Sequence, residues 1–207
     1  MKSHFEYSRF YSPPSLLYPV FMRIFLAITP PEEVKARFAE AVQRLTPFGT
    51  DIAWCKRDQF HLTLAYLGEV SPAILPHATA AAERVCSRLP AFDCRAYGFG
   101  FFGNKRNPKT FWASIEPTPE LDALHEGLWR AFSRFGFKDA EEEFRPHITL
   151  GRGREASRNA ALLEAMDADE AIDFGAWYVS RITFYESKPA PHGPVHRILA
   201  QIGLAGG

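Results

Sequence analysis

Charge of one sign, cysteine and long apolar runs are all scarce in this sequence. The 24 Lys and Arg residues balance 24 Asp and Glu residues, so the formal net charge is zero. A neutral chain is a poor candidate for coating nucleic acid by bulk electrostatic attraction, although it is compatible with a local basic site. No apolar run approaches the ~20 residues that span a bilayer, so we expect no membrane partner.

The only cysteines of the sequence are Cys55, Cys86 and Cys94. Their positions match neither a CxxC pair nor the spacing of metal ligands. An odd number of cysteines without a secretory signal favours reduced, structural thiols, and therefore a cytoplasmic protein.

Signals for a metal or a cofactor are weak. His192 and His196 are close in sequence, but Pro194 breaks the helical i, i+4 geometry and no nearby Cys or carboxylate completes a ligand set. We interpret both as loop histidines. The stretch GFGFFG at 98–103 matches G-x-G-x-x-G in letters, yet it leads into a basic loop and a strand rather than a helix. We therefore expect neither a metal nor a cofactor.

The first 21 residues differ from the rest of the chain. They are rich in Ser, Tyr and Pro and lack the basic start and apolar centre of a signal peptide. We interpret residues 1–21 as an extension that is either disordered or lies over the domain, with Met22 as an alternative start. Residues 22–207 are sufficient for a single domain, and the 18 Phe of the chain predict an aromatic core.

From Met22 onward the same order of elements is expected twice. The first half reads strand, helix, strand, helix, strand at 23–28, 30–45, 60–67, 73–89 and 92–102. The second half repeats this order at 110–115, 116–136, 144–151, 157–166 and 176–186, with one more strand at 196–204. The loop GNKRNPK at 103–109 is the natural joint between the halves.

The spacing within the halves is also alike. Ile24 precedes His61 by 37 residues, and Phe111 precedes His147 by 36. We expect an α+β fold whose duplicated strand–helix–strand units form two pseudo-twofold-related lobes, with largely antiparallel sheets around a central cleft. The lobes correspond roughly to 22–103 and 110–207 of one bilobal domain, and an exchange of elements between them fits the pattern.

Each half carries the same kind of motif, which is HLTL beginning at His61 and HITL beginning at His147. Random placement of the 7 His and 9 Thr gives roughly 0.3 His-x-Thr matches, so two matches in equivalent frames are informative. Side chains alternate between the faces of a strand, so His61 shares a face with Thr63, and His147 shares one with Thr149. A single strand histidine beside a threonine is more often structural, and it is the repeat that favours a functional site.

If the two strands meet, the cleft holds two imidazoles and two hydroxyls. The next in-phase residues, Ala65 and Gly151, are small and are expected to leave room for a ligand. A neutral imidazole can take a proton from an attacking oxygen while a protonated one gives a proton to the leaving oxygen, which suits phosphodiester cleavage without a metal. The threonine hydroxyls can donate to phosphate oxygens.

Together these motifs resemble those of the two-histidine phosphoesterase superfamily. The stretches MRIFLAITPPEEV, HLTLAYLGEV, FRPHITLGR and ITFYESKPAPHGPVHRI are similar to RNA 2′,3′-cyclic phosphodiesterases, also called 2′-5′ RNA ligase-like proteins, over nearly the whole chain. The resemblance implies that His61 is the proton donor and His147 the proton acceptor. It also implies that Thr63 and Thr149 contact the phosphate and that a cyclic phosphate is opened to a 2′-phosphate end.

Basic residues near the second motif are candidates for binding the substrate. Arg145 is in phase with the second histidine, and either a phosphate contact or a salt bridge to the glutamates at 141–143 fits its position. Arg152 is out of phase unless Gly151 bends the strand, but the family often has a basic residue after this motif. The basic residues at 105–109 fit a solvated loop better than a phosphate contact.

The sequence therefore predicts metal-independent hydrolysis of RNA ends, or of nucleotides, that carry 2′,3′-cyclic phosphates. One alternative is 2′-5′ RNA ligation, in which the same site runs in reverse. Another is a non-catalytic module that only holds RNA or a nucleotide. No protein partner is implied, and we expect a cytoplasmic monomer.

Overall fold

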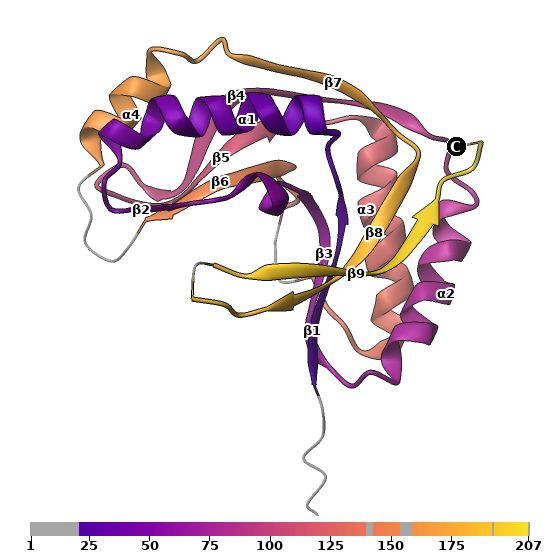
Figure 1. Cartoon of the computed structure of the whole chain (residues 1–207). Helices are drawn as coiled ribbons and strands as arrows, with labels where there is room; N and C mark the ends of the chain where they lie inside the picture. The colour runs from indigo at the N-terminus through magenta and orange to yellow at the C-terminus, as the bar shows by residue number, and fades with distance from the viewer. Residues whose placement is uncertain (1–20, 140–142, 154–158, 192, 207) are drawn as a thin grey trace, which may run out of the picture.

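The computed structural model describes residues 21–139, 143–153, 159–191 and 193–206. The extension expected at 1–21 therefore lies outside the described residues, apart from an exposed Phe21. Within the described part, four α-helices pack around one strongly curled sheet of nine strands, as Figure 1 shows. The predicted α+β class is confirmed.

The elements follow the predicted order, with ends that differ by a few residues. The α-helices are α1 (Glu32–Leu45), α2 (Ile74–Cys86), α3 (Pro119–Phe132) and α4 (Ala160–Asp167). The strands are β1 (Met22–Ile28), β2 (Ile52–Trp54), β3 (Leu62–Val70), β4 (Phe92–Asn104), β5 (Asn107–Ile115), β6 (His147–Gly153), β7 (Asp173–Val179), β8 (Arg181–Lys188) and β9 (Val195–Gly203). Single 3-10 turns are η1 (Thr46–Phe48), η2 (Arg57–Gln59) and η3 (Ser133–Phe135).

The order of strands in the sheet has a twofold pattern. It runs β7-β4-β5-β6-β3-β1-β8-β9, with β2 added to β6, and neighbouring strands are antiparallel. Two sets of four strands are joined between β3 and β6, through the register pair Leu62↔Ile148. We call this junction the seam. Reversing the order exchanges β3 with β6 and β1 with β5, which are the strands that the sequence repeat makes equivalent.

Each half of the chain contributes to both halves of the sheet. β4 comes from the first half of the chain but pairs with β5 and β7, whereas β8 comes from the second half and pairs with β1. The helices are exchanged in the same way. α1 and α4 cover the side of β4 and β7, and α2 and α3 cover the side of β3 and β9 (Figure 1).

The single strand predicted at 176–186 is wrong. The chain leaves one strand at Ser180 and enters another, so that β7 pairs with β4 while β8 pairs with β1, in opposite halves of the sheet. The apolar pattern continues through this break because Val179 and Ile182 are both buried. The predicted loop at 103–109 is also too long, since β4 and β5 form a hairpin with a turn at Lys105 and Arg106.

Phenylalanines fill the core, as their number predicted. Phe38 of α1 packs against Phe60 and Phe174, with ring centroids 5.5 and 4.8 Å apart, and all three side chains are buried. Phe60 immediately precedes His61, so the contact that seats α1 on the sheet also fixes the chain at the start of β3. No helix within the described ranges is long and apolar enough to cross a membrane.

Candidate active site

The two histidines of the repeated motif lie at the seam. The register pair that joins β3 to β6 consists of the residue after each histidine, and both of its members are buried. In an antiparallel pair the neighbours of opposed residues are also opposed, so His61 lies across from Thr149, and His147 lies across from Thr63. All four polar side chains are half-buried on the other face of the sheet. The structure thus brings the four predicted motif residues together.

Backbone carbonyls orient both imidazoles in the same way. Nδ1 of His61 lies 2.7 Å from the carbonyl oxygen of Gln59, and Nδ1 of His147 lies 2.7 Å from that of Arg145. A carbonyl oxygen can only accept, so each Nδ1 carries a proton and donates it. The Nε2 atom of each ring is then the nitrogen that can exchange a proton with a ligand.

Both motif strands contain a β-bulge directly after the threonine. The register steps from Thr63 to Ala65 in β3 against a single step of β1. It steps from Thr149 to Gly151 in β6 against a single step of β5. Each bulge adds one residue to its strand and therefore shifts the alternation of faces. The repeat thus extends to the local irregularity of the two strands.

The bulge in β6 contradicts the expectation that Gly151 leaves room for a ligand. Ala65 is buried but helps to line a cavity with Thr63 and His147, whereas Gly151 is buried against β2. A Cβ atom on Gly151 would lie 2.6 Å from the Ile52 side chain and 2.7 Å from that of Trp54. The small residue in β6 therefore makes room for β2, a strand that the sequence did not predict.

Burial and nearby cations keep both imidazoles neutral at pH 7. Burial lowers the pKa of His61 to about 3, and the charge of Arg152, together with His196 and His147 when these are protonated, also lowers it. Burial likewise lowers the pKa of His147, with a further contribution from Arg152. An anion between the two Nε2 atoms would favour the protonated forms, because an opposite charge stabilises a cation.

The bulge in β6 shifts the alternation of side chains and brings Arg152 to the same face as His147 and Thr149. Simple alternation along the strand would have placed it on the opposite face. Arg152 is exposed, and its Nη1 atom donates to Oγ1 of Thr110 at 3.2 Å. Burial is the main cause of the lowered pKa of His61 and of His147, and the charge of Arg152 lowers both further. Its guanidinium therefore lies within electrostatic reach of each imidazole. Arg152 thus adds a positive charge near both histidines.

Arg145 forms a salt bridge with Glu143, which was one of the two interactions expected for it. Its Nε and Nη2 atoms donate to Oε2 of Glu143 at 3.1 and 2.8 Å. Its carbonyl oxygen holds His147, and its side chain helps to line a cavity of about 290 Å³ that Thr63 and His147 also line. Arg145 therefore orients His147 through its backbone, while its side chain is paired with Glu143 at the edge of this cavity.

Aromatic rings support each imidazole from the side. Phe25 of β1 lies 4.7 Å from His61 between ring centroids, and Trp112, its counterpart in β5, lies 5.8 Å from His147. Phe102 of β4 meets His147 edge-on at 4.8 Å. These contacts restrict the imidazole planes and account for the burial that lowers their pKa.

A third histidine, His196, lies beside the first. His196 was interpreted as a loop histidine, although the strand predicted at 196–204 begins with it. It belongs to β9, and its ring is T-shaped to that of His61 at 5.1 Å. Burial lowers its pKa, and the charge of Asp58 acts in the opposite direction. The signal was weak because only the pairing of β9 with β8, opposite Ser187, shows where this histidine lies.

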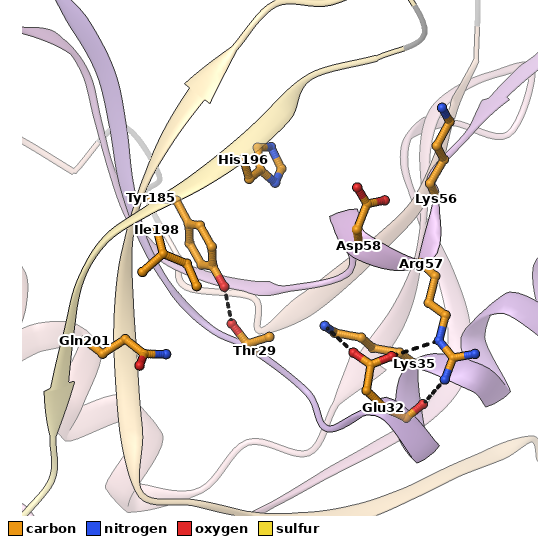
Figure 2. Close-up of a pocket in the computed structure, with 10 residues that line it drawn as sticks. All are labelled: Thr29, Glu32, Lys35, Lys56, Arg57, Asp58, Tyr185, His196, Ile198 and Gln201. Carbon is orange, nitrogen blue, oxygen red and sulfur yellow. Dashed lines mark hydrogen bonds and ion pairs between the residues drawn. The ribbon is translucent and has the colours of Figure 1, made fainter.

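A cavity of about 590 Å³ opens beyond His196. The hairpin of β8 and β9 forms one of its walls, and the start of α1 together with η2 forms the other (Figure 2). We call it the hairpin pocket, and its lining includes Thr29, Lys56, Arg57, Tyr185, His196 and Ile198.

Other reactive groups are absent from the described part of the structure. It contains no group of three or more His, Cys, Asp or Glu side chains that could hold a metal ion. The cysteines are free, and burial raises the pKa of the Cys55 thiol to about 11 and of the Cys86 and Cys94 thiols to about 12. These thiols are protonated and unreactive at neutral pH.

The fold is an α+β fold with one curled sheet, and each half of the chain presents one His-x-Thr pair on a shared face of that sheet. This is the architecture of the two-histidine phosphoesterases. The model of the 2′-5′ RNA ligase superfamily matches residues 30–190, and the chain belongs to this superfamily.

Relatives of similar length support this membership. The RNA 2′,3′-cyclic phosphodiesterase of Thermotoga maritima is 35% identical over 193 residues, which cover 90% of this chain and 97% of the relative. The protein with the same name from Thermus thermophilus is 31% identical, over 89% of this chain and 91% of its own length.

Solved structures are similar over the same extent. The crystal structure of TT0787 of Thermus thermophilus superposes with a TM-score of 0.76 at 30% identity and covers 89% of this chain and 99% of that chain. Escherichia coli LigT complexed with 3′-AMP gives a TM-score of 0.72 at 25% identity, with the same two shares.

Proposed function

We propose that this chain opens 2′,3′-cyclic phosphates at RNA ends and leaves 2′-phosphates. The observation that carries the proposal is the symmetric presentation of two imidazoles at the seam, each with Nδ1 held by a carbonyl and Nε2 free to exchange a proton. The names of the relatives from Thermotoga maritima and Thermus thermophilus support the choice of substrate.

In the proposed reaction, water attacks phosphorus opposite the bond to the ribose O3′. One proton of the water passes to Nε2 of His147, the P–O3′ bond breaks, and O3′ takes a proton from Nε2 of His61. The phosphate remains on O2′. The two histidines exchange protonation states, and proton exchange with water restores them.

The remaining motif residues act on the charge of the phosphate. The hydroxyls of Thr63 and Thr149 donate to its non-bridging oxygens, where negative charge accumulates in the transition state. Each threonine lies across the seam from the histidine of the other motif, so both hydroxyls reach the same phosphate. Arg152 adds a positive charge on this face, and Arg145 holds His147 in place.

His61 can act as the proton donor only if binding of the substrate causes its imidazole to become protonated. A pKa of about 3 leaves this imidazole neutral at pH 7 in the absence of an anion. The negative charge of the phosphate raises the pKa of His61, so binding is coupled to uptake of a proton and tightens as the pH falls. The assignment of donor and acceptor itself comes from the family resemblance.

The name of the superfamily favours ligation as a second candidate. The same step in reverse joins a cyclic phosphate to a 5′-hydroxyl, and bulk water competes with that hydroxyl, so hydrolysis is the expected net direction. The monomeric state, the cytoplasmic location and the division into lobes near 103–110 stay predictions from the sequence.

Turnover of a short RNA with a 2′,3′-cyclic phosphate end, in the presence of EDTA, tests the proposal. We expect a 2′-phosphate product, and a loss of about 10²–10⁴-fold in turnover for His61→Ala and for His147→Ala. The double variant should be little worse than either single variant, because groups that act as a unit are not additive. Thr63→Val and Thr149→Val should lose less.

Each other outcome of this assay contradicts a defined part of the proposal. Full turnover in either histidine variant excludes the paired mechanism, and turnover that EDTA abolishes and Zn²⁺ restores excludes metal independence. Binding of the RNA without turnover indicates a holding module. A joined product in excess over hydrolysis, with an acceptor end present, indicates a ligase.

A further inference from the structure

The hairpin pocket continues from the active site along a series of rings. His196 lines the pocket and also contacts His61, with ring centroids 5.1 Å apart. Phe25 lies 5.0 Å from His196, and its ring stacks on Tyr185 at 5.3 Å with planes 21° apart. Tyr185 and His196 are half-buried and present their rings to the pocket, while Phe25 is buried and packs against both. Flat apolar surfaces of this kind stack nucleobases with little regard to base identity.

The wall opposite these rings is basic on balance. Glu32 is shared between Lys35 and Arg57, each at 3.0 Å, so one carboxylate meets two cations. Asp58 is the second carboxylate of the lining, and it lies near His196. Lys56 is exposed, forms no ion pair within the described ranges, and extends away from Glu32 in Figure 2. Its ammonium group is therefore available to an anion at the rim.

The size and the remaining lining of the pocket suit one nucleotide. Its volume of about 590 Å³ lies within the range of about 300–1,000 Å³ that is common for small-molecule sites. Ile198 is 56% exposed and faces the pocket beside Tyr185, whose hydroxyl shares a hydrogen bond of 2.6 Å with Thr29. A base can lie on the apolar side while its phosphate meets the basic side.

We propose that the hairpin pocket binds the nucleotide that precedes the cyclic end of an RNA chain, with its phosphate at Lys56 and its base against Tyr185 and Ile198. This inference rests on the proposed function, because the reacting end must lie between His61 and His147. An RNA chain leaves its 3′-terminal ribose in one direction, through the 5′ phosphate, and the pocket is a continuation of the site beside His61. The protein therefore prefers an RNA end to a cyclic mononucleotide.

Kinetics with two substrates tests this preference. We compare kcat/KM for 2′,3′-cyclic AMP with kcat/KM for a dinucleotide that ends in a 2′,3′-cyclic phosphate. The wild type should prefer the dinucleotide by about tenfold or more, the effect of one stacked base. Lys56→Ala and Ile198→Glu should lower kcat/KM for the dinucleotide several-fold and leave the mononucleotide unchanged. Arg88→Ala, which removes the same charge from an exposed site after α2, is the control and should change neither value.

Salt dependence provides a readout that a purely structural role would not move. Calorimetry measures binding of the dinucleotide product with a terminal 2′-phosphate at several salt concentrations. Loss of one phosphate contact in Lys56→Ala should make the slope of log affinity against log salt less steep by about 0.7, whereas Arg88→Ala should keep the wild-type slope.

The outcomes separate this inference from the proposed function. Equal kcat/KM for the two substrates, or equal losses on both in Lys56→Ala and Ile198→Glu, overturns the pocket assignment and leaves the hydrolysis intact. Absence of turnover on both substrates by the wild type overturns the proposed function, and with it the inference that depends on it.

Discussion

At the scale of single residues, a hydrogen bond to a backbone carbonyl decides what each imidazole can do. Because Nδ1 of His61 and of His147 is committed as a donor, proton exchange is restricted to Nε2. The acceptor is the carbonyl oxygen two positions earlier in both motifs. The side chains of Gln59 and Arg145 are therefore not needed for this bond, and other residues at these positions can supply the same carbonyl.

The low pKa of His61 predicts that acid destabilises the protein through this residue. The pKa is about 3 in the folded chain against an ordinary value of 6.5, so the unfolded chain binds more protons between these pH values. Stability that is fully present above pH 6.5 is then lost as the pH falls toward 3. His61→Asn, which keeps a donor near the place of Nδ1, should lose less stability than the wild type over this window.

Urea denaturation at a series of pH values measures this difference. His77→Asn, at an exposed position of α2, is the matched control and should follow the wild-type curve. If the curve of His61→Asn runs parallel to that of the wild type instead, His61 does not titrate as its environment requires.

At the scale of elements, the β-bulge that follows the threonine in each motif strand decides which side chains reach the open face of the sheet. Simple alternation places Ala65 and Gly151 beside the motif residues, whereas the bulges bury both and expose Tyr66 and Arg152 in their place. The sequence gives no sign of this shift, because a bulge depends on the register with the neighbouring strand. Arg152 was therefore predicted as a site residue, but the face of the strand on which it lies could not be predicted.

Substitution of Gly151 tests whether the bulge packs against β2. In Gly151→Ala the new Cβ would lie 2.6 Å from Ile52 and 2.7 Å from Trp54, and overpacking of this kind costs about 1–3 kcal/mol. Gly203→Ala is the matched control, since its Cβ would lie 3.9 Å from its nearest neighbour, the carbonyl oxygen of Ser180. Thermal or urea unfolding should rank Gly151→Ala well below Gly203→Ala, and equal stabilities contradict the packing described here.

Local patterns predicted the elements better than their partners. The apolar faces of α1 and α3 and the alternation of β3 and β6 are visible in the sequence because each depends on its own spacing. The break at Ser180 and the position of His196 depend on pairing with strands far along the chain. For that reason the first was predicted as a continuous strand, and the second was placed at the start of a strand without any link to His61.

At the scale of the whole molecule, the proposed active site lies where the two halves of the sheet meet. The repeat predicted two related lobes, and the twin motifs predicted a shared cleft on the condition that their strands meet. The pairing of β3 with β6 fulfils that condition. The sequence allowed an exchange of elements between the halves, but it did not predict that β4, β8 and the helices are the elements exchanged. Exchange is decided by packing between distant segments, which periodicity does not report.

The environments of the two histidines are not equivalent although their motifs are. His61 lies beside another imidazole, that of His196, whereas His147 lies beside the rings of Phe102 and Trp112. This difference gives a physical basis for different roles within a nearly symmetric frame. In the proposed reaction, each half of the molecule supplies one of the two proton transfers.

A leaving group that needs no proton tests this claim most directly. We compare kcat/KM for an RNA end with a cyclic phosphate and for a phosphodiester with a nitrophenolate leaving group, in His61→Ala and in His147→Ala. We expect His61→Ala to recover a large part of its lost activity on the nitrophenyl substrate, because a general acid is then dispensable, and His147→Ala not to recover. Equal recovery of both variants, or recovery of His147→Ala alone, would contradict this claim.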